Sequence, residues 1–104
     1  MPIITIPSDA SIELDDKTHA FSFVADFINK TVLRDRQWGV TTEQLIVAME
    51  IRSAFKGKTA GDQVSLSSDQ WNKLCEVVKR PTDPYNPLVM IECGAFLDAI
   101  LKAG

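Results

Sequence analysis

Few side chains in this sequence are of the kinds that carry out chemistry. His19 is the single histidine, so a Ser-His-Asp or Cys-His catalytic arrangement would have to include it. The adjacent residues Asp15 and Asp16 could hold a divalent ion, but a charged turn ahead of a helix is the commoner role of such a pair. No C-x-x-C or H-x-x-x-H spacing occurs, which argues against a zinc site. The sequence therefore predicts neither catalytic residues nor metal ligands, and we expect His19 at the surface.

Two further features have only a superficial likeness to chemical motifs. Residues 56–61 read Lys-Gly-Lys-Thr-Ala-Gly, yet they follow a predicted helix and precede a predicted strand, which is the reverse of a phosphate-binding loop. We interpret them as a helix stop and a loop. Cys75 and Cys93 lie within apolar helical stripes, where thiolate formation is disfavoured, so we expect two buried, reduced thiols. No cofactor is predicted.

Composition and charge narrow the class of protein. The 104-residue chain has a hydrophobic fraction of 45% and a charged fraction of 24%, which predicts one soluble domain over residues 1–104. The net charge of −3 gives no long-range attraction to nucleic acid or anionic lipid. No apolar run reaches the ~20 residues of a membrane span, and Met1-Pro2-Ile3 is unlike a secretory signal. We therefore expect a cytoplasmic protein that binds neither nucleic acid nor membrane.

The elements that would position any site begin with short strands. Residues 3–6 are β-branched throughout, and residues 12–14 alternate apolar with polar, so with the turn between them they predict a hairpin. Residues 63–66 alternate in the same way and predict another strand. The expected fold class is α+β, with a small three-stranded antiparallel sheet covered by about four helices.

Helices are predicted by apolar periodicity and by capping patterns. Apolar residues spaced by three and four predict an amphipathic helix over residues 18–33. Capping boxes predict the starts of two more helices, one over residues 41–57 that ends at a glycine and one over residues 67–80 that a proline stops. The capping pairs are Thr41 with Gln44 and Ser67 with Gln70.

Residues 87–103 predict a last helix that is apolar on nearly all sides. Such a helix is either enclosed by the core, or packed on the domain with one side and on a second chain with the other. Gly94 in its middle fits a place where another backbone approaches closely. The aromatic residues and the proline-rich link at residues 80–87 are also typical of contact surfaces. The candidate interface residues are Trp38, Tyr85, Val89, Cys93, Phe96, Leu97 and Leu101.

The short edge strands and the acidic, compact body without a cofactor motif resemble the small accessory proteins of tailed phages and prophages. The apolar last helix and the lack of a catalytic motif favour a non-enzymatic protein-binding factor. The resemblance implies either an assembly or adaptor protein of a phage-like particle or an inhibitor of a host machine, located in the host cytoplasm or in the virion. On this hypothesis the protein self-associates through the last helix and has a protein partner. One alternative is an acidic mimic of nucleic acid that inhibits a DNA- or RNA-binding enzyme. Another is a small enzyme whose site is built at a dimer cleft from carboxylates and His19.

Overall fold

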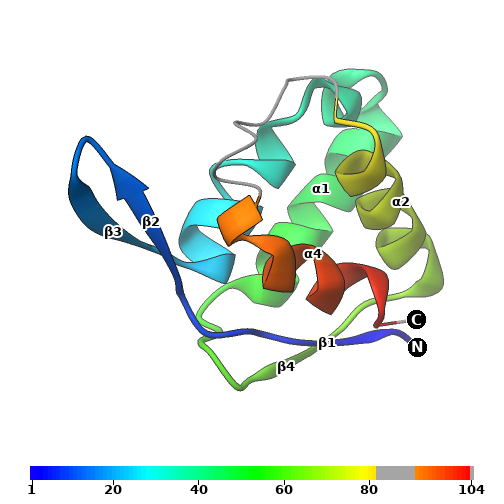
Figure 1. Ribbon diagram of the computed structural model, residues 1–104. Coiled ribbons are helices and arrows are strands. Elements are labelled where there is room, and N and C mark those ends of the chain that lie inside the picture. The colour runs from blue at the N-terminus through cyan, green and yellow to red at the C-terminus, as the bar shows by residue number, and fades with distance from the viewer. Residues whose placement is uncertain (82–90, 104) are drawn as a thin grey trace.

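The structure, a computed structural model, describes residues 1–81 and 91–103 and shows an α+β protein (Figure 1). Its strands form two small antiparallel sheets. β1 (Ile3–Thr5) pairs with β4 (Gln63–Ser65), and β2 (Ala10–Leu14) pairs with β3 (Lys17–Phe21). The predicted fold class is confirmed, whereas the expected single sheet of three strands is replaced by these two pairs.

The hairpin predicted over residues 3–14 is wrong, because its second strand pairs forward along the chain. Asp15 and Asp16 have positive φ angles of 52° and 61°, and they connect β2 to β3 as a two-residue turn. Turns with positive φ at both central residues match the twist of paired strands, and Asp tolerates this backbone region better than most residues. The β2–β3 hairpin projects from the body of the molecule (Figure 1).

The helix predicted over residues 18–33 is also wrong. The chain forms β3, then a π-helical segment η1 (Phe23–Ile28) and a 3-10 turn η2 (Val32–Arg34). In η1 the N–H groups of Phe27 and Asn29 donate to carbonyls five residues earlier, each at 3.0 Å. The apolar side chains of this segment still reach the core, so the periodicity identified buried residues but not the backbone that carries them.

Asp26 and Ser22 form reciprocal hydrogen bonds at the N-terminus of η1. Asp26 Oδ2 accepts a hydrogen bond from the backbone N–H of Ser22 at 2.9 Å, and the N–H of Asp26 donates to Oγ of Ser22 at 3.2 Å. Lys30 Nζ lies 3.4 Å from Oδ1. The backbone hydrogen bond from Ser22, together with Lys30, outweighs desolvation and lowers the pKa of Asp26 below 3.8.

We expect Asp26 to make stability depend on pH in the acid range. Because its pKa is lower in the folded chain, its contribution is present above the unfolded-state pKa of about 3.9 and is lost as the pH falls through the folded value. The free energy of unfolding, measured by urea denaturation at several pH values, should therefore fall more steeply below about pH 4 in the wild type than in Asp26→Asn. Parallel curves for the two proteins would contradict this role.

The two helices that begin with predicted caps are confirmed. α1 (Thr42–Phe55) and α2 (Ser68–Lys79) start where the capping patterns place them. At α2 the box is complete: Ser67 Oγ accepts from the N–H of Gln70 at 3.1 Å, and Gln70 Oε1 accepts from the N–H of Ser67 at 3.0 Å. At α1 the hydroxyl of Thr41 caps the helix, but the reciprocal bond is missing within the described residues.

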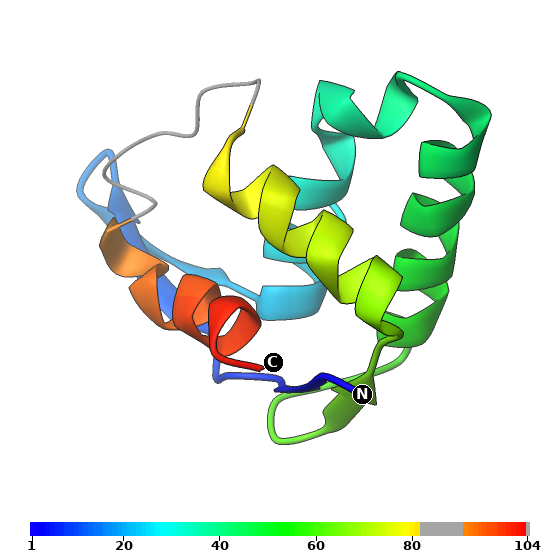
Figure 2. The ribbon, with the colours of Figure 1, turned by 90° about the vertical axis from the view of Figure 1, so that its right-hand side faces the viewer.

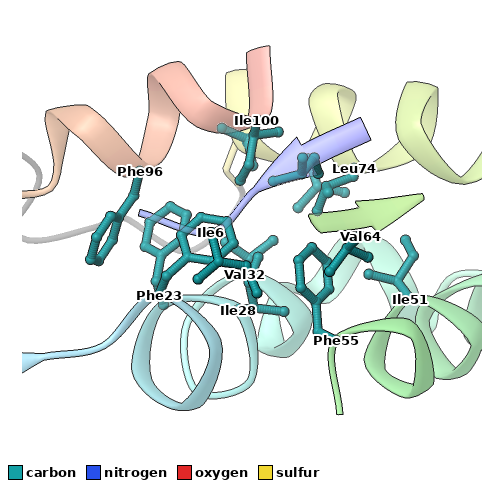
Figure 3. Packing of buried hydrophobic residues seen from close by; sticks show 14 of the residues in the cluster. Ile6, Phe23, Ile28, Val32, Ile51, Phe55, Val64, Leu74, Phe96 and Ile100 are labelled. Carbon is teal, nitrogen blue, oxygen red and sulfur yellow. The ribbon is translucent and has the colours of Figure 1, made fainter. Parts of the chain in front are cut away.

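The core lies between α2 and α4 (Gly94–Leu101) on one side and η1 and α1 on the other, with side chains from β1 and β4 closing it (Figure 3). α2 runs between α1 and α4 (Figure 2). All five phenylalanines of the chain join one cluster. The ring of Phe23 lies 5.3 Å from that of Phe96 and 5.7 Å from that of Phe55, so this cluster ties η1 to both α4 and α1.

The last helix is only partly as predicted. Residues 87–90 of the expected range lie outside the described residues. Gly94 begins α4 rather than lying in mid-helix, and a Cβ added there would meet nothing within 4 Å, so the expected close approach of another backbone is absent among the described residues. Phe96 and Ile100 point into the core, whereas Ile91 is 74% exposed. The described part of this segment therefore has one core face and one outer face.

Candidate protein-binding surface

The residues predicted as an interface do not form one surface. Trp38, Cys93 and Phe96 are buried in the core of the single chain. Leu97 is half-buried, and Leu101 is 36% exposed at the end of α4. The buried residues offer no contact area to a partner in this conformation. The remaining candidates, which lie outside the described residues, are Tyr85 and Val89.

Trp38 is buried because the segment between the predicted helices, residues 34–40, is structured. A 3-10 helix, η3 (Arg36–Gly39), is capped by Asp35, whose Oδ1 accepts from the N–H of Gln37 at 3.0 Å. The indole N–H of Trp38 donates to the carbonyl of Val32 at 3.0 Å, so the ring is buried with its polar atom satisfied. Trp38 therefore packs in the core, although its neighbours in the sequence are charged and polar.

The residue types that could carry out chemistry are dispersed. His19 lies on the exposed strand β3, in register with Ile12 of β2. Burial raises the pKa of both thiols, Cys75 and Cys93, so neither is an activated nucleophile. Among residues 1–81 and 91–103 no group of three or more His, Cys, Asp or Glu side chains could hold a metal ion. Within the same ranges, every helix is too short or too polar to cross a membrane.

Large exposed apolar side chains gather on α1. We define the α1 outer face as Val40, which precedes the helix, and Leu45, Ile46 and Met49, which lie on its solvent side. Met49 is 67% exposed and Val40 is 72% exposed, while Leu45 and Ile46 are 47% and 49% exposed. The opposite side of α1 carries the buried residues of the helix. This helix is therefore apolar on two sides, of which only one faces the core.

A groove runs beside this face. Three adjacent hollows, with volumes of about 550, 470 and 380 Å³, all border Asn29 in the turn after η1. We call them together the α1–η1 groove. Leu45 and Met49 of the α1 outer face line the largest hollow together with Leu33 and Trp38. The amide oxygen of Asn29 is buried and accepts no hydrogen bond from the described residues.

The charge of the groove is opposite to that of the chain. The chain has 11 basic and 14 acidic residues, yet among the described residues the three hollows are lined by several basic side chains and a single carboxylate, Asp9. Lys30 is paired with Asp26, but the other basic side chains form no ion pair within the described residues. The acidic chain therefore keeps a cationic lining beside exposed apolar residues. The basic residues are Lys30, Arg34, Arg52, Lys56 and Lys58.

No family model, curated protein or solved structure matches this chain. Its function is therefore inferred from the α1 outer face and the α1–η1 groove themselves. Sequence reasoning missed both, because it predicted the helix over residues 41–57 from its caps and looked for an exposed apolar face only on the last helix. The signal that could have found them is the position of Leu45 and Ile46 next to each other, since adjacent helical residues point about 100° apart and cannot both face the core centrally.

Proposed function

We propose that the protein is a non-enzymatic protein-binding factor whose contact surface is the α1 outer face. The observation that carries this proposal is the clustering of exposed large apolar side chains at neighbouring positions on one helix. Exposed apolar residues scattered singly need no explanation, but a contiguous group rimmed by polar residues is typical of an interaction site. Assembly, adaptor and inhibitory roles all require a surface of this kind.

The α1 outer face supports the proposal better than the last helix does. The sequence favours residues 87–103 as the contact, with self-association through them. In the described part of that segment, Phe96 and Ile100 are turned into the core, and the largest exposed apolar side chains are Ile91 and Leu101. The α1 outer face has four large exposed apolar residues, three on α1 and Val40 just before it, so we assign the partner contact to this face.

The helix that carries the surface is held firmly from behind. Ile51 and Phe55 of α1 are fully buried, and the Phe55 ring lies 5.7 Å from that of Phe23. Glu50 Oε2 accepts a hydrogen bond from Nε2 of Gln70 on α2 at 2.7 Å. A rigid helix loses little conformational freedom when it binds, which favours affinity.

The proposal is tested by comparing partner capture by the wild type and by Leu45→Gln/Met49→Gln. Both chains are tagged, incubated with extract of the native cells and analysed by quantitative mass spectrometry, and light scattering records whether a second copy is the partner. We expect a specific protein, retained by the wild type, to be reduced by about tenfold or more in the double variant, as hot-spot losses of 1.4 kcal/mol or more require. Equal retention of every protein by both chains, with both monomeric, would refute the proposal.

A further inference from the structure

We propose that the α1–η1 groove receives an acidic amphipathic helix of a partner protein. This inference rests on the proposed function and adds the chemical class of the partner. The occupant lies along α1, with its apolar side against Leu45 and Met49 and with its carboxylates toward the surrounding cations. Partners of this kind present large apolar residues at positions i, i+3, i+4 and i+7.

The floor of the groove supplies the apolar contact. Leu33 from η2 and Trp38 from η3 line the 550 Å³ hollow together with Leu45 and Met49 of α1. An apolar side chain that fills this hollow removes exposed surface of Leu45 and Met49 from water, which is favourable in proportion to the area buried. Methionine adapts its shape to different partner side chains, and this suits Met49 to such a floor.

The walls of the groove supply the charge preference. Arg34 is the last residue of η2 on one wall, and Arg52 and Lys56 belong to α1 and its C-terminal end on the other. None of these forms an ion pair within the described residues, so each can pair with an incoming carboxylate. Because exposed cations on both walls attract acidic side chains and repel basic ones, the groove discriminates between helices by charge.

The length of α1 sets the length of the occupant. Its 14 residues span about 21 Å at 1.5 Å per residue. A partner helix that runs alongside it therefore needs about three to four turns, or about 12–15 residues.

Two other occupants fit the observations less well. A symmetric second copy brings the same patch to the interface, so Arg34 and Arg52 of both copies would oppose one another. A bilayer surface is flat, whereas here the cations surround a hollow that a rod can fill. A separate acidic helix satisfies both the apolar floor and the basic walls.

The test uses two synthetic fluorescein-labelled helical peptides of 16 residues. Both carry Leu at i, i+3, i+4 and i+7, and one has Glu and the other Lys at the flanking positions. Fluorescence anisotropy measures their affinity for the full chain. Since one exposed ion pair changes affinity by about two- to fivefold, we expect the acidic peptide to bind about tenfold or more tightly than the basic one, with a preference that weakens as salt is added. Arg34→Glu/Arg52→Glu should abolish the preference, while Lys17→Glu, a single charge reversal on the projecting hairpin, should keep it and serves as the control.

Each of the following results would overturn the acidic-helix inference. They also show whether the proposed function fails with it. If both peptides bound equally and Leu45→Gln/Met49→Gln abolished this binding, the partner would not need to be acidic. The α1 outer face would still be a protein-binding surface. Binding of neither peptide, with a dimer that the same double variant dissociates, would make the face a contact between copies and also leave the proposed function standing. Tighter binding to phosphatidylserine vesicles than to either peptide would replace both proposals with a membrane contact. Binding of neither peptide by a monomer would overturn the acidic-helix inference alone, and the capture experiment would then decide the proposed function.

Discussion

Phe96→Ala is expected to lower the free energy of unfolding by about 3–5 kcal/mol, the usual cost of removing a buried phenylalanine ring. Phe96 is fully buried, and its ring lies 5.3 Å from that of Phe23, 5.5 Å from that of Phe27 and 6.3 Å from that of Phe21. The substitution therefore opens a cavity at the contact between α4, η1 and β3. Urea denaturation followed by circular dichroism measures the loss.

Two variants make this prediction decisive even if the alanine protein does not fold. Phe96→Leu keeps most of the volume and should cost about 1.5 kcal/mol or less. Leu101→Ala, on the partly exposed side of the same helix, should cost under about 1 kcal/mol. A larger loss from Leu101→Ala than from Phe96→Leu would mean that α4 turns its other face to the core.

Trp38→Ala is expected to have an effect of similar size, about 3–5 kcal/mol, for two reasons. The ring is 2% exposed, so its removal leaves a large cavity. The carbonyl of Val32 also loses the indole N–H that donates to it at 3.0 Å. Thermal unfolding should show a decrease in Tm of more than about 10 °C for a domain of this size.

Trp38→Phe separates the two contributions. It keeps most of the apolar contact and removes the donor, so it should cost about 1–3 kcal/mol, the range for an unsatisfied buried polar group. If Trp38→Ala left the Tm unchanged, the ring would not belong to the core, and Trp38 would again be a candidate for an exposed contact residue.

The helix starts were predictable because their signals are local. The Ser67 and Gln70 side chains complete their box within one turn, and no tertiary contact is needed to select it. The stop of α2 before Pro81 and the positive φ of 76° at Gly57, just after α1, follow from backbone sterics alone. These features depend on neighbouring residues, which a single sequence contains.

The sheet pairing and the backbone of residues 18–28 were not predictable in the same way. β1 pairs with β4 across about 60 residues of sequence, and no local pattern specifies that partner. The turn at Asp15-Asp16 lacks the glycine that usually announces a two-residue hairpin. Phe23, Phe27 and Ile28 have helical spacing, yet the chain buries them from a single π-helical segment. Apolar spacing indicates which residues are buried, and tertiary contacts decide the backbone that buries them.

The candidate surface could not be predicted from the sequence for the same reason. An apolar helix can be recognised in a sequence, but which of its faces is covered depends on the rest of the fold. For the last helix the aromatic cluster covers Phe96, whereas for α1 nothing in the described residues covers Met49. The sequence predicted an exposed apolar helix face on the last helix, but Phe96 and Ile100 of that helix are buried in the core.

The central claim, that α1 rather than the last helix meets the partner, is tested most directly by measuring the captured partner's Kd for two matched double variants. Leu45→Gln/Met49→Gln changes the α1 outer face, and Ile91→Gln/Leu101→Gln changes the exposed apolar residues of the last segment. We predict that the first raises the Kd by about tenfold or more and that the second changes it by less than about twofold. The opposite pattern, with the Ile91/Leu101 variant losing the partner and the Leu45/Met49 variant keeping it, would contradict the assignment.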